Sequence, residues 1–253
     1  KLISRVGIGL DSVDLLTAKE HKINVSYTPD APAPAVADLT IGLMYSLLRK
    51  IHEANLSMHK GNWNRFFGKS LNDCTVGLIG VGRVGSRVLK SLQLLGVKRI
   101  LYNDNKVRLS TEDHNVEFAE KKLIYMEADI ISIHVPLSHK SKNMITEAEL
   151  SLMKEQVFLI NTSRGGIINE DHLNIALKKK TIAGAAIDVF VDEPYNGALV
   201  ENSNCLLTSH MGSMTSYCRS RMEIEATEEV VRFVKGIPLR SKVPNNEYQA
   251  KLK

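Results

Sequence analysis

Three short segments of the sequence end an apolar run with side chains that can do chemistry. They are "VFLINTSRGG", which holds Arg164, "AAIDVFVDEP", which holds Asp188 and Glu193, and "LLTSHMGS", which holds His210. An arginine grips a carboxylate with two parallel hydrogen bonds and polarises a carbonyl group beside it. A histidine gives or takes a proton near neutral pH, and a neighbouring carboxylate fixes its tautomer. Together these groups could orient and protonate a small 2-oxo acid.

Each of these side chains also has an ordinary structural interpretation. Arg164 could be a surface ion-pair partner, Glu193 a turn residue before a proline, and His210 a hydrogen-bonded loop residue. The catalytic interpretation is favoured because all three follow apolar runs that are typical of buried parallel strands. In an open α/β sheet, ligands bind beyond the carboxyl ends of the strands, where these side chains would meet.

A glycine fingerprint, "TVGLIGVGRVGS", precedes these segments in the chain. Gly80 is expected to make a tight turn, Gly82 to let the backbone approach a pyrophosphate, and Gly85 to let a helix pack closely on a strand. Arg83 and Val84 of the same loop are also expected to bind the cofactor. The following helix would offer N–H groups and the positive end of its dipole to the phosphates. The fingerprint therefore predicts a dinucleotide site.

The strand that follows the fingerprint bears on which dinucleotide binds. It ends in "LYND", where Asp104 could accept hydrogen bonds from ribose hydroxyls and repel a 2′-phosphate, which favours NAD over NADP. Lys106 and Arg108 lie close by in the sequence and could instead receive such a phosphate. We predict NAD, with NADP as the alternative. His134, at the end of a further apolar run, is expected to line the cofactor site rather than to move protons.

Short apolar runs alternate with helical patterns along most of the chain. Such alternation is typical of βαβ units and of a mostly parallel sheet. We predict an α/β fold with a Rossmann-type doubly wound parallel sheet in residues 34–215 and a second, smaller domain in residues 1–33 and 216–253.

Two long helices are expected to connect these domains. One runs from about Pro34 to His59, where apolar residues recur at helical spacing, and the other from about Ser216 to Val234. The tail that follows, "SKVPNNEYQAKLK", is polar and is expected to be frayed.

Composition argues against several classes of function. The 253 residues are 43% hydrophobic and 24% charged, as in ordinary globular proteins. The net charge of +5 is spread along the chain, so no nucleic-acid partner is expected. The three cysteines form no CxxC pair, which indicates neither a zinc site nor a disulfide framework and favours a cytoplasmic location. No membrane partner is expected, because no apolar stretch is long enough to span a bilayer and no signal peptide is recognised.

Taken in order, the motifs resemble those of the D-isomer-specific 2-hydroxyacid dehydrogenases. The resemblance is carried by "VGIGLDSVD", "AVADLTIGLMYSLLR", "TVGLIGVGRVGS", "ISIHVPLSHKS", "LINTSRGGIINE", "AGAAIDVFVDEP" and "LTSHMGSMT". It implies an NAD-dependent enzyme that interconverts a D-2-hydroxy acid and its 2-oxo acid. In such an enzyme Arg164 would hold the substrate carboxylate, and Glu193 and His210 would form the acid–base pair.

The resemblance implies further site residues and a partner. Asp188 would contact the nicotinamide carboxamide, and the backbone of Gly7, Ile8 and Gly9 would receive the substrate carboxylate. The other residues expected at the cofactor are Pro136, Thr162 and Gly212. Family members are usually homodimers. The smaller domain would be a truncated flavodoxin-like substrate domain whose N-terminal part is missing from this chain.

Two other functions remain open at this stage. One is an NAD(H)-sensing binding protein similar to the family's transcriptional corepressors, and the other is a truncated, inactive relative that still binds nucleotide. The chain departs from the motif of the dehydrogenase family at Ser209, which precedes His210 where the family has a proline. Turnover of small 2-oxo acids would distinguish the enzyme from both alternatives.

Overall fold

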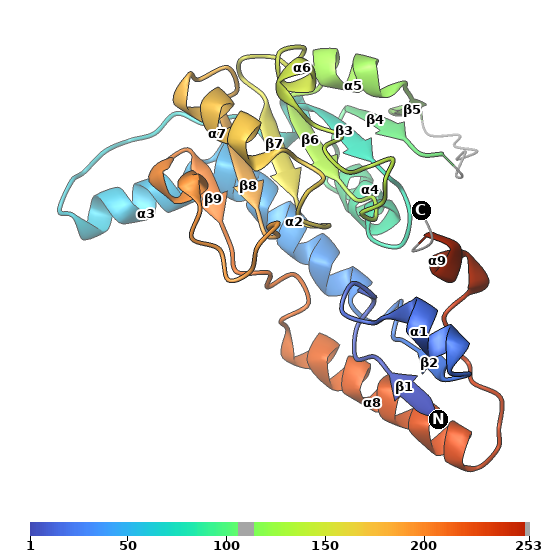
Figure 1. Ribbon diagram of the computed structural model, residues 1–253. Coiled ribbons are helices and arrows are strands. Elements are labelled where there is room, and N and C mark those ends of the chain that lie inside the picture. The colour runs from blue at the N-terminus through green and yellow to red at the C-terminus, as the bar shows by residue number, and fades with distance from the viewer. Residues whose placement is uncertain (106–113, 251–253) are drawn as a thin grey trace. The chain divides into compact units, whose positions relative to one another are not determined.

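The computed structural model describes residues 1–105 and 114–250. The chain divides into two compact units, one of Lys1–Val36 with Ser213–Lys253 and the other of Ala37–Gly212 (Figure 1). The predicted domain boundaries, at residues 33 and 216, differ from these by a few residues. Lys106 and Arg108, which bear on the choice of cofactor, lie outside the described residues.

A seven-stranded parallel sheet forms the centre of the larger unit. Its strands are β3 (Thr75–Ile79), β4 (Arg99–Asn103), β5 (Val116–Phe118), β6 (Ile130–Ile133), β7 (Phe158–Asn161), β8 (Gly184–Ile187) and β9 (Cys205–Leu207). They lie in the order β5-β4-β3-β6-β7-β8-β9, and every neighbouring pair is parallel. The chain runs outward from β3 in one direction and from β6 in the other, so ligands are expected beyond these two strands. The predicted Rossmann-type fold is confirmed.

Two apolar cores cover the two faces of this sheet. Val76 and Leu78 of β3 face one core, whereas Ile79 faces the other. The helices of the unit are α2 (Ala33–Leu48, of which residues 33–36 belong to the smaller unit), α3 (Ile51–His59), α4 (Gly85–Leu94), α5 (Lys121–Glu127), α6 (Glu147–Leu150) and α7 (Glu170–Lys178). Short 3-10 turns lie at Leu71–Asp73 and Ala198–Glu201. Buried residues of α2 and α4 contribute to the first core, and those of α5, α6 and α7 to the second. Burial on both faces explains why the strands are almost wholly apolar.

The helix predicted from Pro34 to His59 is interrupted, so its prediction as one element was wrong. Lys50 has a φ of 51°, a left-handed conformation that ends α2 before α3 begins. Leu43, Met44 and Leu47 of α2 are buried against the sheet, whereas α3 contributes no buried residue. The helical stripe therefore ends where the sheet no longer covers it.

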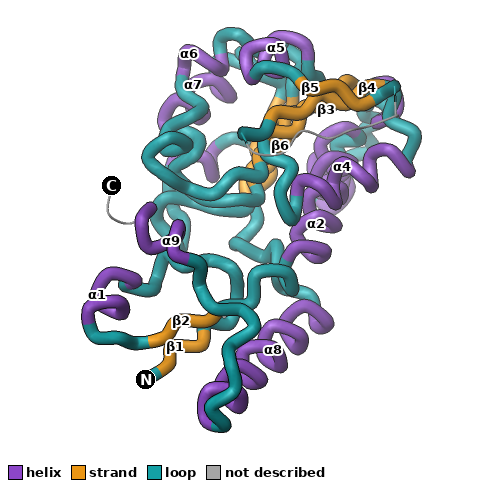
Figure 2. Tube along the Cα trace, turned by 90° about the vertical axis from the view of Figure 1, so that its right-hand side faces the viewer, coloured by secondary structure: helices purple, strands orange, loops and turns teal. Residues whose placement is uncertain are grey.

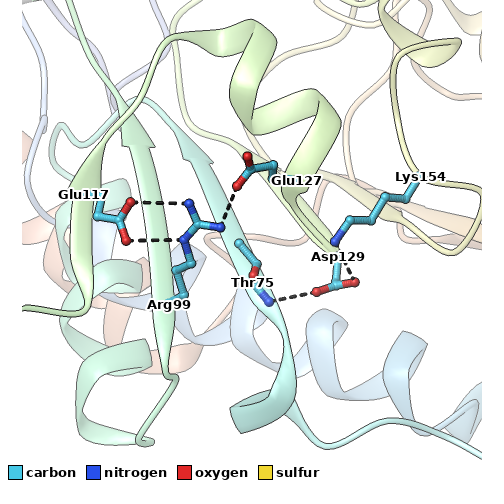
Figure 3. Close-up of polar contacts among 6 residues, drawn as sticks. All are labelled: Thr75, Arg99, Glu117, Glu127, Asp129 and Lys154. Atoms are coloured by element: carbon cyan, nitrogen blue, oxygen red, sulfur yellow. Dashed lines mark hydrogen bonds and ion pairs between the residues drawn. The ribbon is translucent and has the colours of Figure 1, made fainter.

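Charged side chains gather at the amino ends of the strands (Figure 3). Arg99, which begins β4, pairs with Glu117 of β5 at 3.3 Å. Asp129, just before β6, accepts a hydrogen bond from the Thr75 N–H group at 2.9 Å and pairs with Lys154 at 3.3 Å. These contacts tie the starts of neighbouring strands together at the edge opposite the predicted chemistry.

The smaller unit is built on two parallel strands. β1 (Leu2–Ser4) pairs with β2 (Asn24–Ser26), and α1 (Leu15–Glu20), α8 (Ser216–Val234) and α9 (Asn245–Ala250) complete the unit (Figure 2). The Ser4 hydroxyl donates to the carbonyl oxygen of Ala226 at 2.8 Å, which ties β1 to α8. The expectation of a frayed tail was wrong for residues 241–250, because Tyr248 of α9 packs in an apolar cluster with Leu15 and Val25. The last three residues of this tail, 251–253, lie outside the described residues. Within the part of the chain that the structure describes, no helix combines the length and apolar character needed to cross a membrane.

Candidate active site

The glycine loop lies where β3 meets β6, at the carboxyl edge of the sheet. Gly80 has a φ of 95°, and a Cβ atom there would lie 2.7 Å from the carbonyl oxygen of His134. A Cβ atom on Gly85 would clash with the carbonyl oxygen of Gly80, so the first turn of α4 packs directly on the loop. In contrast, a Cβ atom on Gly82 would meet nothing within 4 Å. The two outer glycines are thus required by packing, and the middle one leaves open space.

The surroundings of this open space fit a dinucleotide. Among the described residues, no side chain caps the N-terminus of α4 with a hydrogen bond at Val84, which leaves that end of the helix dipole for an anion. Asp104 follows β4, and its Oδ2 atom accepts a hydrogen bond from the Val81 N–H group at 2.9 Å. The carboxylate is therefore fixed against the glycine loop, beside the expected ribose position. Arg83 is exposed on the same loop.

His134 and Pro136 follow β6 on the other side of the switch point. The Nε2 atom of His134 lies 2.9 Å from the Ser132 hydroxyl oxygen. Burial lowers the pKa of His134 from its usual 6.5 to about 4, so the imidazole is neutral at pH 7. A neutral ring has no proton to donate as an acid at pH 7. That His134 lines the cofactor site stays a prediction. Pro136 is exposed, and its carbonyl oxygen accepts a hydrogen bond from Ser141.

Arg164 lies on a tight turn after β7 that a single buried side chain organises. Asn161, which is 2% exposed, accepts hydrogen bonds from the N–H and hydroxyl groups of Ser163 at 3.0 and 2.7 Å. Its amide group donates to the carbonyl oxygen of Arg164 at 2.9 Å. The guanidinium group donates to the Ser163 carbonyl oxygen at 2.6 Å. The backbone of the arginine is thus held by Asn161, a role that its position in an apolar run did not reveal.

Glu193 and His210 come together after β8 and β9. The His210 Nδ1 atom lies 2.8 Å from Glu193 Oε2, and the two side chains are 49% and 36% exposed. The other carboxylate oxygen of Glu193 accepts a hydrogen bond from the Phe190 N–H group at 3.0 Å. With Nδ1 bonded to a carboxylate, Nε2 is the ring atom left to exchange a proton with a ligand. The geometry therefore suits an acid–base pair.

Asp188 holds the loop that carries His210. This carboxylate is 1% exposed and accepts hydrogen bonds from the Thr208 hydroxyl at 2.6 Å and from the N–H groups of Met211 and Gly212 at 2.9 and 3.0 Å. Its backbone carbonyl oxygen accepts from the His210 N–H group at 2.8 Å. Sequence reasoning placed Asp188 and Gly212 at the cofactor and missed this contact between them. The contact of Asp188 with a carboxamide stays a prediction.

The remaining predicted residues make contacts within their own units. The Thr162 hydroxyl is buried and lies 3.0 Å from that of Thr40 on α2, so it ties the end of β7 to this helix. In the smaller unit, the Gly7 N–H group donates to the Thr28 hydroxyl at 2.7 Å. The Arg5 guanidinium donates to the carbonyl oxygen of Gly9 at 3.0 Å. The loop that includes Ile8 is therefore ordered by its own hydrogen bonds.

The described residues hold no group of three or more His, Cys, Asp or Glu that could bind a metal ion. Cys74, Cys205 and Cys218 are free and buried. Burial raises the pKa of Cys205 to about 12 and that of Cys74 to about 11, so both stay protonated thiols at neutral pH.

The chain is similar in sequence to two reductases. The chain is 35% identical over 246 residues to a glyoxylate reductase from Thermococcus litoralis, a match that covers 93% of this chain and 74% of that protein. It is 37% identical over 238 residues to a hydroxypyruvate reductase from Thermotoga maritima, covering 92% of this chain and 77% of the other.

Solved structures of other proteins have a similar fold. The D-lactate dehydrogenase from Aquifex aeolicus, complexed with NAD and lactic acid, superposes with a TM-score of 0.86 at 30% identity, over 93% of this chain and 77% of that one. An acyclic imino acid reductase in complex with NADPH and D-Arg gives a TM-score of 0.85 at 27% identity, over 96% and 78%. Residues 41–212 match the NAD binding domain of the D-isomer specific 2-hydroxyacid dehydrogenases. The chain therefore belongs to the D-isomer-specific 2-hydroxyacid dehydrogenase family, as its motifs predicted.

Proposed function

We propose that this protein is an NAD-dependent dehydrogenase that interconverts a D-2-hydroxy acid and its 2-oxo acid. The observation that supports this proposal most is the contact between Glu193 and His210, 2.8 Å apart at the carboxyl edge of the sheet. The same edge carries the glycine loop, beside which a nicotinamide cofactor would bind. An acid–base pair and a hydride carrier are the two components that carbonyl reduction requires.

In the proposed mechanism, Arg164 binds the carboxylate of the 2-oxo acid and polarises its carbonyl group. The bound cofactor would supply a hydride to the carbonyl carbon. The Nε2 atom of His210 then donates its proton to the carbonyl oxygen, which yields the hydroxyl group of the product. Glu193 stabilises the protonated imidazole before this transfer and holds its tautomer. Oxidation of the hydroxy acid runs through the same groups in reverse.

We propose NAD rather than NADP as the cofactor. The position of Asp104, fixed against the glycine loop by the Val81 N–H group, supports this choice because a carboxylate there would repel a 2′-phosphate. The imino acid reductase with a similar fold was solved with NADPH, so the fold itself does not discriminate. The ratio of kcat/KM for NADH to that for NADPH tests the proposal, which fails if NADPH is preferred.

Small 2-oxo acids are the proposed substrates, with glyoxylate and hydroxypyruvate first because the similar reductases carry those names. A phosphate group on the substrate would need a cationic partner. The Arg5 guanidinium orders its own loop by donating to the carbonyl oxygens of Val6 and Gly9, at 2.7 and 3.0 Å, so a phosphate would compete with these two bonds. We therefore expect unphosphorylated acids to be preferred.

We also propose that the protein is a homodimer that uses the arm formed by residues 51–67. This arm exposes large apolar side chains, among them Trp63 at 77% and Phe67 at 97%. Exposed aromatic residues in one segment are typical of protein interfaces. Sedimentation equilibrium should give twice the chain mass, and Trp63→Asp with Phe67→Asp should give a monomer. An unaltered mass in the double variant would contradict the use of this arm.

The cytoplasmic location stays a prediction.

Loss of NADH absorbance in the presence of glyoxylate, hydroxypyruvate, pyruvate and 3-phosphohydroxypyruvate tests the proposed activity. Turnover of any of them supports the dehydrogenase. Tight NADH binding without turnover would contradict it and favour a dinucleotide-sensing protein. Absence of NADH binding would contradict both.

A further inference from the structure

We propose that Glu170 is a positioning residue that sets the acid–base pair relative to Arg164. This inference rests on the proposed function, because it assigns a role within that site. Glu170 is the first residue of α7 and is not one of the residues that the sequence predicted to be catalytic. Residues 162–165, which carry Arg164, are called the arginine turn. Glu170 follows this turn in the chain and contacts a second turn, residues 189–193, which carries Glu193.

The arginine turn and the 189–193 turn meet backbone against backbone. Gly165 directly follows Arg164, and a Cβ atom at this glycine would clash with the carbonyl oxygen of Phe190 and lie 2.5 Å from the Val191 nitrogen. No side chain fits between the two turns. Any shift of the 189–193 turn would therefore be felt directly at the arginine.

Glu170 holds the 189–193 turn by one of its backbone N–H groups. Its Oε1 atom accepts a hydrogen bond from the Val191 N–H group at 2.8 Å. The preceding N–H group, of Phe190, donates to Glu193 itself at 3.0 Å. Two successive peptide groups are thus bound by two carboxylates, one of which is the partner of His210. Loss of the Glu170 contact would free the turn on the side where Glu193 is anchored.

The position of Glu170 is itself well defined. The Asn169 side chain caps α7 by accepting a hydrogen bond from the His172 N–H group at 3.0 Å. The side chain of Phe190, at the start of the turn, stacks on Tyr195 with ring centroids 4.1 Å apart. The start of the turn is therefore fixed by ring packing, and Glu170 holds the Val191 peptide that follows it.

The charge of Glu170 is separable from its hydrogen bond. Burial raises its pKa and the carboxylates of Asp192, Asp171 and Glu193 add to this effect, while the Val191 N–H group opposes it. Glutamine at this position would keep an acceptor oxygen and remove the charge. A positioning role through the hydrogen bond thus predicts that Glu170→Gln preserves activity and that Glu170→Ala does not.

The test compares Glu170→Ala, Glu170→Gln and the control Asp171→Ala in the full chain, with the 2-oxo acid that the unaltered protein reduces best. Asp171 also lies in the first turn of α7 but is exposed. We expect Glu170→Ala to lower kcat about tenfold with an unchanged NADH dissociation constant, and the other two variants to stay within about twofold of the unaltered protein.

A second arm combines Glu170→Ala with His210→Ala. If Glu170 acts through the acid–base pair, its loss adds little in the absence of the histidine. Equal activity of Glu170→Ala and Asp171→Ala would overturn the inference, as would a Glu170→Gln variant as slow as Glu170→Ala or full additivity with His210→Ala. If the unaltered protein binds NADH but reduces none of the acids, the proposed function fails and this inference fails with it.

Discussion

The carboxyl edge of the large sheet has two halves that are organised in different ways. Beyond β3, β4 and β6, the loops take their positions because side chains are missing, as at Gly80 and Gly85. Beyond β7, β8 and β9, they take their positions because Asn161 and Asp188 are buried and hydrogen-bonded to the turns that follow. Close backbone packing dominates in the first half, whereas the second half adds buried, hydrogen-bonded side chains to its own close packing at Gly165.

This difference matches the demands of the two proposed tasks. A dinucleotide needs room and free N–H groups, which glycines at a helix N-terminus provide. Proton transfer needs side chains held within a few tenths of an ångström, and buried hydrogen bonds supply that restraint. We therefore expect substitutions in the first half to affect cofactor binding and packing, and substitutions in the second half to affect turnover and loop order.

The largest effect is expected for His210→Ala. Removal of a positioned proton donor should lower kcat by about a hundredfold to ten-thousandfold. The glycine loop lies in the other half, so the NADH dissociation constant, measured by fluorescence titration, should not change. Parallel loss of NADH binding and turnover would show that the two halves are not independent and that His210 has a structural role.

Asp188→Ala is expected to have the next largest effect. It would remove the acceptor for the Thr208 hydroxyl and for two N–H groups, those of Met211 and Gly212. Each buried donor left without a partner costs about 1–3 kcal/mol, so urea unfolding should show a loss of roughly 3 kcal/mol in the free energy of unfolding.

The same variant tests the role first predicted for Asp188. If its main contact were the nicotinamide carboxamide, Asp188→Ala would weaken NADH binding and leave the stability of the free protein unchanged. Asp188→Asn is the matched control, because it keeps one acceptor oxygen and should lose less stability than the alanine variant.

A pair of glycine substitutions examines the other half. Gly85→Ala would force its Cβ atom into the carbonyl oxygen of Gly80, and overpacking of this kind costs about 1–3 kcal/mol. Gly82→Ala meets open space, so its unfolding free energy should stay within about 0.5 kcal/mol, while its affinity for NADH falls. Thermal unfolding without NADH measures the loss of stability, and the additional stabilisation on adding NADH measures the affinity for the cofactor. Equal destabilisation by both would contradict the assignment of the open space to the cofactor.

The same contrast explains what could be predicted from the sequence. The spacing of Gly80, Gly82 and Gly85 predicts a loop because its constraints are local. The pairing of Glu193 with His210 was also predictable, because parallel strands bring their carboxyl ends to one edge.

The hydrogen-bonded supports were not predictable in this way. The partners of Asp188 lie in the loop that follows another strand, β9, and the contact of Glu170 with Val191 joins the start of α7 to a separate turn. Such pairs depend on how the strands are placed beside one another, which residue spacing alone does not contain. The break at Lys50 was missed for a related reason, since apolar residues recur in the sequence up to Ile51 although burial against the sheet stops at Leu48.

The smallest effect concerns the pH dependence of stability at the boundary between the halves. His134 is neutral in the folded protein down to about pH 4, because burial lowers the pKa of its imidazole from the usual 6.5. Between these pH values the unfolded chain binds a proton that the folded chain does not, so stability should fall as the pH drops from 6.5 to 4. The side chain is partly exposed, and we therefore expect a loss of roughly 1–2 kcal/mol rather than the full value of the shift. Urea unfolding over the same pH range checks this, because the unfolding free energy of His134→Gln should fall by about 1–2 kcal/mol less than that of the unaltered protein. An equal fall in both proteins would mean that the imidazole is hydrated and that this end of β6 is open to water.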